Sequence, residues 1–266
     1  MCGCGFTRTA VALVTMSEIA GTDMTDSVLE ATSRNSEPRT DLPVRLPMKI
    51  FQIGFNKCGT STIHHYLQSN GISSVHWDRG RLAQRMFANL ADGLDLLAGY
   101  EQFDAFTDME YLDDAGTYLE GYKLFPYLAA QYSGAVFILN TRDREDWIRS
   151  RLAHGKSSYA RRHMEYHKVR TVEELATIWR ADWERHHRRV VEFFRGKPYR
   201  FLVCRIDTDL PHMLNAQLSE CKLDPRHYQV RKSRSSAPGI GGGRGRTWKS
   251  RARSVISRFA PRSSCR

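Results

Sequence analysis

The segment Gly54 to Thr62 (GFNKCGTST) holds the densest set of residues that could do chemistry. In a loop between a strand and a helix, backbone N–H groups and the positive end of the helix form a cradle for a phosphate or sulfate group. Lys57 adds a mobile positive charge, and the residues after Gly59 add hydroxyl donors. The alternative is a plain strand-to-helix turn with Lys57 in solvent. The predicted anion-binding residues are Asn56, Lys57, Cys58, Gly59, Thr60, Ser61 and Thr62.

This loop differs from the phosphate-binding loop of nucleotide kinases. That loop has the pattern G-x-x-x-x-G-K-[ST], in which the lysine directly follows the second glycine and the next hydroxyl binds magnesium. Here Lys57 precedes Gly59, and Thr60 takes the place of that lysine. The apolar strand AVFILNT also leads to Arg142 instead of an aspartate that would hold magnesium. A P-loop nucleotide kinase or NTPase is therefore an alternative that the order of residues disfavours, and we expect no metal.

Short apolar runs alternate with segments of helical spacing across residues 48–229. The run Ala135 to Leu139 (AVFIL) is unbroken, as the strands of buried parallel sheets require. Strands that alternate with helices predict an α/β fold, here a P-loop-type parallel sheet with helices on both faces. The predicted strands are 49–55, 74–77, 103–109, 135–139 and 199–206. The predicted helices are 60–69, 81–97, 118–132, 143–152, 172–194 and 211–218.

The elements predict where a ligand binds. In open α/β sheets, ligands bind at the carboxyl ends of the strands. This rule selects three segments as parts of the site: 54–62, 107–110 and 140–150. The second segment places Asp108 at the end of a predicted strand, and the third contains Arg142, followed by Asp143 as the predicted N-cap of the next helix.

Two of these segments resemble elements of the sulfotransferase superfamily. Lys-x-Gly-Thr-Ser/Thr after an N-terminal strand is similar to the loop that binds the 5′-phosphosulfate of 3′-phosphoadenosine 5′-phosphosulfate (PAPS) in these enzymes. The second family element is a strand that leads to an Arg, with a Ser eight residues later, and the two hold the donor's 3′-phosphate. Arg142 and Ser150 have this spacing, about two helical turns apart. The resemblance spans roughly residues 48–218 and points to a bacterial branch of the superfamily.

The resemblance implies an enzyme that moves a sulfuryl group from PAPS to a hydroxyl or amine acceptor, with a carbohydrate or a lipid as the expected acceptor. Sulfuryl transfer is an in-line displacement, so that the protein contributes mainly positioning and electrostatic stabilisation. Lys57 is then expected to stabilise the charge on the departing phosphate oxygen. The acceptor also needs a general base.

Several residues are candidates for this base. Asp108 is favoured because it ends a predicted strand at the ligand-binding edge, although a helix cap or an ion-pair partner is an equally good interpretation of it. Glu110 and His76 are further candidates. His64 and His65 follow the loop on a predicted helix, where only one of the two can face the site.

Two further segments are basic. Residues 154–170 are rich in Tyr, His, Lys and Arg, and they predict either a solvated helical face or a flap that binds an anionic acceptor. Many superfamily members carry a C-terminal Arg-Lys-Gly loop, then a Gly and a Trp-Lys pair, which cover the nucleotide. Residues 231–233 (RKS), 241–243 (GGG) and 248–249 (WK) depart from this spacing. We therefore assign no residue of this region to the site.

The net charge of +11 is concentrated at the C-terminal end. Residues 1–47, a predicted weakly ordered leader, carry a net charge of −2, and the predicted domain at 48–229 carries +2. Residues 230–266, a Gly/Ser/Arg-rich tail, carry +11. A non-enzymatic protein that binds polyanions through this tail is a further alternative. Specific nucleic-acid binding is not expected, since the tail has few aromatic residues for base stacking.

The remaining composition indicates the cellular setting. No run of about 18 apolar residues exists, so we expect no transmembrane segment. The expected localisation is cytoplasmic, with membrane association as an alternative. The six cysteines have no spacing typical of a disulfide framework, and we expect free thiols. The sequence is silent on the oligomeric state.

Overall fold

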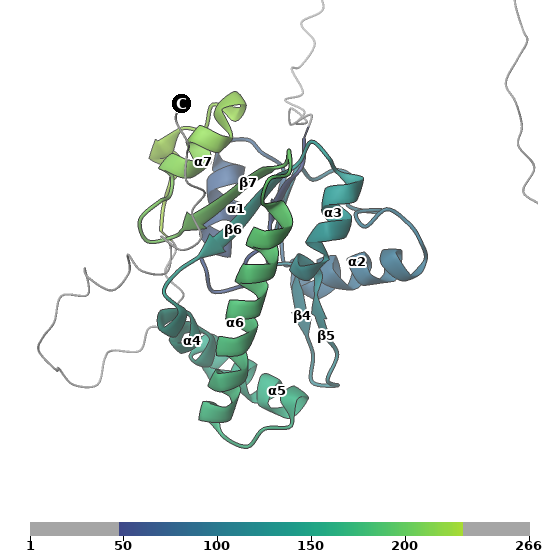
Figure 1. Cartoon of the computed structure of the whole chain (residues 1–266), viewed down its shortest axis with the longest axis vertical. Helices are drawn as coiled ribbons and strands as arrows, with labels where there is room; N and C mark the ends of the chain where they lie inside the picture. The colour runs from purple at the N-terminus through teal and green to yellow at the C-terminus, as the bar shows by residue number, and fades with distance from the viewer. Residues whose placement is uncertain (1–47, 231–266) are drawn as a thin grey trace, which may run out of the picture. The chain divides into compact units, whose positions relative to one another are not determined.

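The computed structural model describes residues 48–230 of the chain, and they form an α/β fold around a five-stranded parallel sheet (Figure 1). The strand order is β2-β3-β1-β6-β7. The predicted leader and nearly all of the predicted tail lie outside the described residues, and the domain boundaries stay a prediction. The strands are β1 (Ile50–Gln52), β2 (Ser74–His76), β3 (Ala105–Thr107), β6 (Val136–Thr141) and β7 (Arg200–Arg205).

Alternate residues of the central strands point to opposite faces of the sheet. Ile50 packs in one apolar cluster, together with residues from α1 (Thr60–Ser69) and α7 (His212–Gln217). Phe51 packs in the other cluster, on the face that the remaining helices cover. Both faces are therefore covered, which confirms the predicted fold class and explains why β6 is buried along its whole length.

The second face carries most of the helical mass. In Figure 1 the long helix α6 lies across the sheet, and α4 and α5 pack against its lower end. A Thr171–Glu174 capping box begins α6, and Asp143 caps α4 as predicted, by accepting hydrogen bonds from two backbone N–H groups. The helices of this face are α2 (Arg81–Ala91), α3 (Phe125–Gln131), α4 (Arg144–Leu152), α5 (Ser158–His167) and α6 (Val172–Phe194).

The prediction of one helix over 118–132 was wrong. Residues Tyr118–Glu120 form β5, which pairs antiparallel with β4 (Glu110–Leu112) in a separate two-stranded sheet. Gly121 then lies so close to the backbone of Met109 that a Cβ atom would meet the Met109 carbonyl at 3.0 Å. This tertiary contact ends the strand, and helix α3 begins only after a 3-10 turn.

The structure also defines the end of α2 and the fold of the basic segment 154–170. Helix α2 ends at Ala91, before Asp92 and Gly93, so Leu94 and Leu97 lie outside the helix. The segment 154–170 folds into a 3-10 turn and α5, an amphipathic helix that buries Tyr159 and His163. Among the helices of residues 48–230, none has the length and apolar character that crossing a bilayer demands.

Candidate active site at the carboxyl edge of the sheet

The predicted anion-binding loop lies where the sheet topology reverses. From β1 the chain continues to β2 and β3 on one side of the sheet, and later to β6 and β7 on the other side. The carboxyl ends of β1 and β6 therefore lie side by side, at the position where open α/β sheets bind ligands. Residues 53–59 follow β1 at this point, and Arg142 follows β6.

The loop has the backbone geometry of an anion cradle. Lys57 and Gly59 both adopt left-handed conformations, with φ values of 61° and 77°. Helix α1 begins directly after Gly59, has no acidic residue in its first turn and has no side chain that caps it. The positive end of the helix at this point favours an anion.

Two buried amide side chains hold the ends of three strands together. Asn140 accepts a hydrogen bond from Gly54 N–H at 3.0 Å and donates to the Cys58 carbonyl at 2.7 Å. Gln52 donates to the Gly54 carbonyl at 2.7 Å and accepts from the N–H of Asp108 at 2.8 Å. Gly54 permits this packing, because a Cβ atom there would meet Asn140 at 2.3 Å. The loop and Asp108 are therefore held in register by side chains within the sheet.

Lys57 is half-buried among charged groups at the centre of the loop. Its Nζ lies 3.3 Å from Nδ1 of His154, which must be the acceptor since an ammonium group only donates. Arg142 donates to the Lys57 carbonyl at 3.2 Å. Burial lowers the pKa of Lys57, the carboxylate of Asp108 opposes this shift, and Arg142 adds to it. Two cations thus meet at the loop, and together they favour an anionic ligand there.

His76 joins the loop to Asp108. Its Nε2 lies 3.2 Å from the Ser61 hydroxyl and 3.6 Å from a carboxylate oxygen of Asp108. Its Nδ1 lies 3.0 Å from the hydroxyl of Thr107, which donates its own proton to the Val75 carbonyl at 3.1 Å. The Thr107 hydroxyl therefore accepts from Nδ1–H, and the lone pair of the neutral imidazole is on Nε2, facing Ser61 and Asp108.

The environment reverses the usual order of basicity in this pair. Burial raises the pKa of Asp108 to about 6, although the positive charges of Lys57 and Arg151 oppose the shift. Burial, assisted by His65, lowers the pKa of His76 to about 4. The carboxylate is therefore a stronger base than the imidazole beside it. At neutral pH, Asp108 is mostly ionised and His76 is neutral.

Other predicted site residues have different surroundings. The Cys58 side chain is fully buried in the apolar core, so only its backbone can face a ligand. The Asn56 side chain is buried as well and donates to Glu110 and Tyr159. Ser150 lies half-buried on α4, and its convergence with Arg142 on a phosphate stays a prediction.

The three hydroxyl residues after Gly59 are not equivalent. Thr60 and Thr62 are buried, and Ser61 is half-buried beside His76. Among the alternative bases, His64 lies 2.9 Å from the Ser74 hydroxyl and packs with its ring against His76. We find no cluster of three His, Cys, Asp or Glu side chains able to hold a metal ion in the described part of the chain. Three cysteines there, Cys58, Cys204 and Cys221, are free thiols, as expected.

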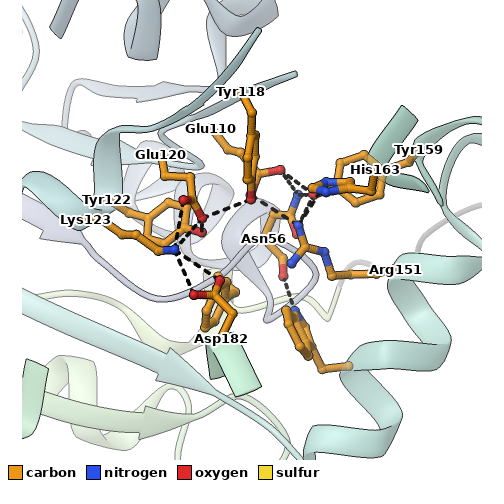
Figure 2. A network of polar contacts seen from close by, with 12 residues as sticks. Asn56, Glu110, Tyr118, Glu120, Tyr122, Lys123, Arg151, Tyr159, His163 and Asp182 are labelled. Atoms are coloured by element: carbon orange, nitrogen blue, oxygen red, sulfur yellow. Dashed lines mark hydrogen bonds and ion pairs between the residues drawn. The ribbon is translucent and has the colours of Figure 1, made fainter. Parts of the chain in front are cut away.

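Behind the loop lies a buried polar network around Arg151 (Figure 2). The Arg151 side chain is fully buried, forms an ion pair with Glu110 at 3.5 Å and donates to the Tyr159 hydroxyl. Tyr159 in turn donates to Glu110, and Trp147 and Trp179 face the guanidinium group at 4.9 and 4.6 Å from their ring centroids. Glu110 thus belongs to this network and not to the open site.

The network connects the loop to helices α4 and α5. Asn56 donates to both Glu110 and Tyr159, and its backbone carbonyl accepts from the Trp147 indole at 3.0 Å. Arg151 was not among the predicted site residues. The signal was present, however, as a charged residue within the apolar stripe that Trp147 and Ile148 begin on α4. Gln52 and Asn140, polar residues in apolar strands, were similar signals.

Replacing Arg151 with Met is expected to lower the free energy of unfolding by about 3 kcal/mol above pH 7, because the carboxylate of Glu110 would be left buried without its partner. Burial already raises the pKa of Glu110 to about 7 against the attraction of Arg151. Below pH 7, Glu110 is largely neutral with or without Arg151, so the loss should shrink as the pH falls. Urea unfolding at pH 5.5 and 8 measures both values.

Arg149 provides the matched control, since it lies on the same helix and is 71% exposed. Arg149→Met should change stability by less than about 0.5 kcal/mol at either pH. Adding Glu110→Gln to Arg151→Met should recover part of the loss, since no charge then lacks its partner. A loss that stays the same at both pH values would contradict this account of the network.

A comparison with protein-family models agrees with the geometry. The chain matches a sulfotransferase domain family over residues 49–203, more than half of its length. The chain therefore belongs to the sulfotransferase-domain family, a family of transferases, as its loop and strand order indicated. No curated protein matches it.

Proposed function

We propose that this protein transfers a sulfuryl group from PAPS to a hydroxyl or amine acceptor, with a carbohydrate or lipid hydroxyl as the expected class. The observation that carries the proposal is Lys57 in a left-handed loop between β1 and α1, with Arg142 at 3.2 Å from its carbonyl. An uncapped helix start and two cations suit the 5′-phosphosulfate of the donor. The family match supports the same reaction class.

The loop residues would hold the donor through its charged groups. The N–H groups at Gly59 and the first turn of α1, with the hydroxyls of Thr60, Ser61 and Thr62, would bind the 5′-phosphate. Arg142 and Ser150 would bind the 3′-phosphate, as the resemblance implies. Lys57, at the centre of the loop, would supply positive charge next to the phosphosulfate of the donor.

In the reaction, the acceptor oxygen forms a bond to sulfur while the bond from sulfur to the 5′-phosphate oxygen breaks. Lys57 would stabilise the negative charge that develops on this departing oxygen. The acceptor's proton passes to a base, and the products are the sulfated acceptor and 3′,5′-ADP. The sulfuryl group is transferred intact, so that no oxidant or reductant takes part.

Asp108 is our proposed base, with His76 as the alternative. A base works best when its pKa is near the operating pH, and that of Asp108, at about 6, is closer to neutrality than that of His76, at about 4. The two side chains have exposures of 19% and 23%, so a proton can reach either. His76 Nε2 would then orient Ser61 and the acceptor hydroxyl.

Donor binding separates this proposal from a nucleotide kinase. We expect the full chain to bind 3′,5′-ADP at least about tenfold more tightly than ATP–Mg, because Arg142 faces the nucleotide loop where a kinase carries a magnesium-binding aspartate. Isothermal titration calorimetry with both nucleotides measures this ratio. Tighter binding of ATP–Mg would overturn the sulfotransferase proposal.

A variant that lacks residues 231–266 should keep 3′,5′-ADP binding, whereas a polyanion binder that acts through the tail would lose its affinity.

A further inference from the structure

An open groove of about 760 Å³ runs beside the edge strand β2. Its walls come from β2, from helix α2 and from the segment 99–103. No residue of the loop 54–62 lines it. His76, however, lines the groove and also contacts Ser61 and Asp108. The groove therefore opens next to the proposed base, on the side of the sheet away from β6.

Helix α2 presents a polar stripe to the groove. Arg81, Gln84, Arg85 and Ala88 all line it, and their spacing of i, i+3, i+4 and i+7 places them on one face of the helix. The opposite face of α2 is apolar, since Leu82 and Met86 are buried in the core. The stripe therefore faces the groove and not the apolar core.

Two arginines line the groove, Arg81 and Arg85. Asp78 pairs with Arg81 at 2.6 Å and accepts a hydrogen bond from Tyr100 at 2.5 Å, so its carboxylate is fully used. Arg85 forms no ion pair or hydrogen bond with any other residue from 48 to 230. His76 is neutral near pH 7. Arg81 and Asp78 cancel, and Arg85 is left to attract an anion.

The chain at the end of β2 is strained in a way that suggests function. Trp77, Asp78, Arg79 and Gly80 have consecutive left-handed φ values of 57°, 46°, 55° and 84°. Such conformations cost energy in residues with side chains, and they gather at binding sites. Here they place Asp78 in the groove and leave Trp77, directly after His76, 47% exposed. Trp77 does not line the groove itself, but its exposed ring follows His76 directly in the chain, and such a ring suits the face of a sugar.

We propose that this groove binds the acceptor, and that the acceptor is a sugar with a carboxylate or sulfate group held by Arg85. This inference rests on the proposed sulfuryl transfer and narrows its acceptor class. The anion would lie against α2, and the sugar would extend along β2 so that one hydroxyl reaches His76 and Asp108. Neutral sugars would lose the contact with Arg85.

Two probes that differ in one group test this proposal. p-Nitrophenyl β-D-glucuronide carries a carboxylate where p-nitrophenyl β-D-glucoside carries a hydroxymethyl group. With saturating 3′,5′-ADP, the full chain should bind the glucuronide about tenfold more tightly, the size of one charge-assisted hydrogen bond. Arg85→Gln should remove this preference, and Arg85→Lys should keep most of it. Arg188→Gln, an exposed arginine on α6, removes the same charge elsewhere and should change nothing.

The outcomes distinguish the groove from the donor site. Equal binding of the two probes, binding of neither, or a preference that survives in Arg85→Gln would overturn the proposal. So would a loss of 3′,5′-ADP affinity in Arg85→Gln, because Arg85 would then serve the donor. The titrations are repeated without nucleotide, so that the glucuronide preference is measured even if donor binding, and with it the proposed function, fails.

Discussion

Replacing Lys57 with Ala is expected to lower kcat for sulfuryl transfer by about 10²–10³-fold, the usual effect of removing one group that stabilises transition-state charge. Lys57 is half-buried beside Asp108 and Arg142, in a site where charge is poorly screened by water. The affinity for 3′,5′-ADP should fall as well, because this product keeps the charged 5′-phosphate oxygen that Lys57 would hold. Release of 3′,5′-ADP from PAPS with a panel of sugar and lipid acceptors gives kcat, and calorimetry gives the affinity.

Lys197 supplies the control for this substitution. It is exposed just before β7, at the amino edge of the sheet, and Lys197→Ala should leave kcat unchanged. Lys57→Arg should keep part of the rate, because the charge remains although its geometry changes. If Lys57→Ala retained more than a tenth of the wild-type kcat, Lys57 would not be the group that stabilises the departing oxygen.

Replacing Asp108 with Asn is expected to lower kcat/KM by about 10²–10⁴-fold, the usual contribution of a general base. The wild-type kcat/KM should rise with pH and level off above an apparent pKa near 6, since only the ionised carboxylate can accept a proton. This rising limb should vanish in the variant. Asn is the appropriate replacement, because Asp108 has a φ of 55°, a conformation that Asn tolerates better than Ala.

The same pH profile identifies the base if Asp108 is not the one. A limb near pH 4 that persists in Asp108→Asn would transfer the role to His76, whose pKa burial lowers to about 4. Asp92→Asn, at the exposed end of α2, is the control and should leave the profile as it is. Circular dichroism and 3′,5′-ADP affinity would show that each variant keeps its fold and its donor loop.

The main elements of the fold were predictable because they depend on local pattern. The unbroken apolar run 135–139 and the long amphipathic stripe 172–194 both appear in the structure, as β6 and α6. The hairpin of β4 and β5 was missed, since its short strands become favourable only when they pair with each other and Gly121 packs against Met109. A contact between distant residues leaves no periodic signal in either segment.

The candidate site also has a part that was predictable from sequence and a part that was not. The loop around Lys57 and the strand ends at Asp108 and Arg142 could be placed from sequence, because parallel strands bring their carboxyl ends to one edge. The pKa that makes Asp108 a suitable base could not be predicted from sequence. Its pKa depends on how deeply the folded chain buries it and on which charges lie near, and both depend on the packing of several elements.

By itself the sequence determined the five strands of the main sheet, the loop that carries Lys57 and the concentration of the net charge near the C-terminal end, because these follow from residue types in short stretches. Only the tertiary structure decided that Glu110 pairs with Arg151 behind the loop while Asp108 meets His76 in front of it. It also placed Arg85 in the groove beside β2, where no other residue from 48 to 230 forms an ion pair with it. These pairings join residues up to several dozen positions apart, and only packing brings such residues within the few ångströms over which charges and hydrogen bonds act.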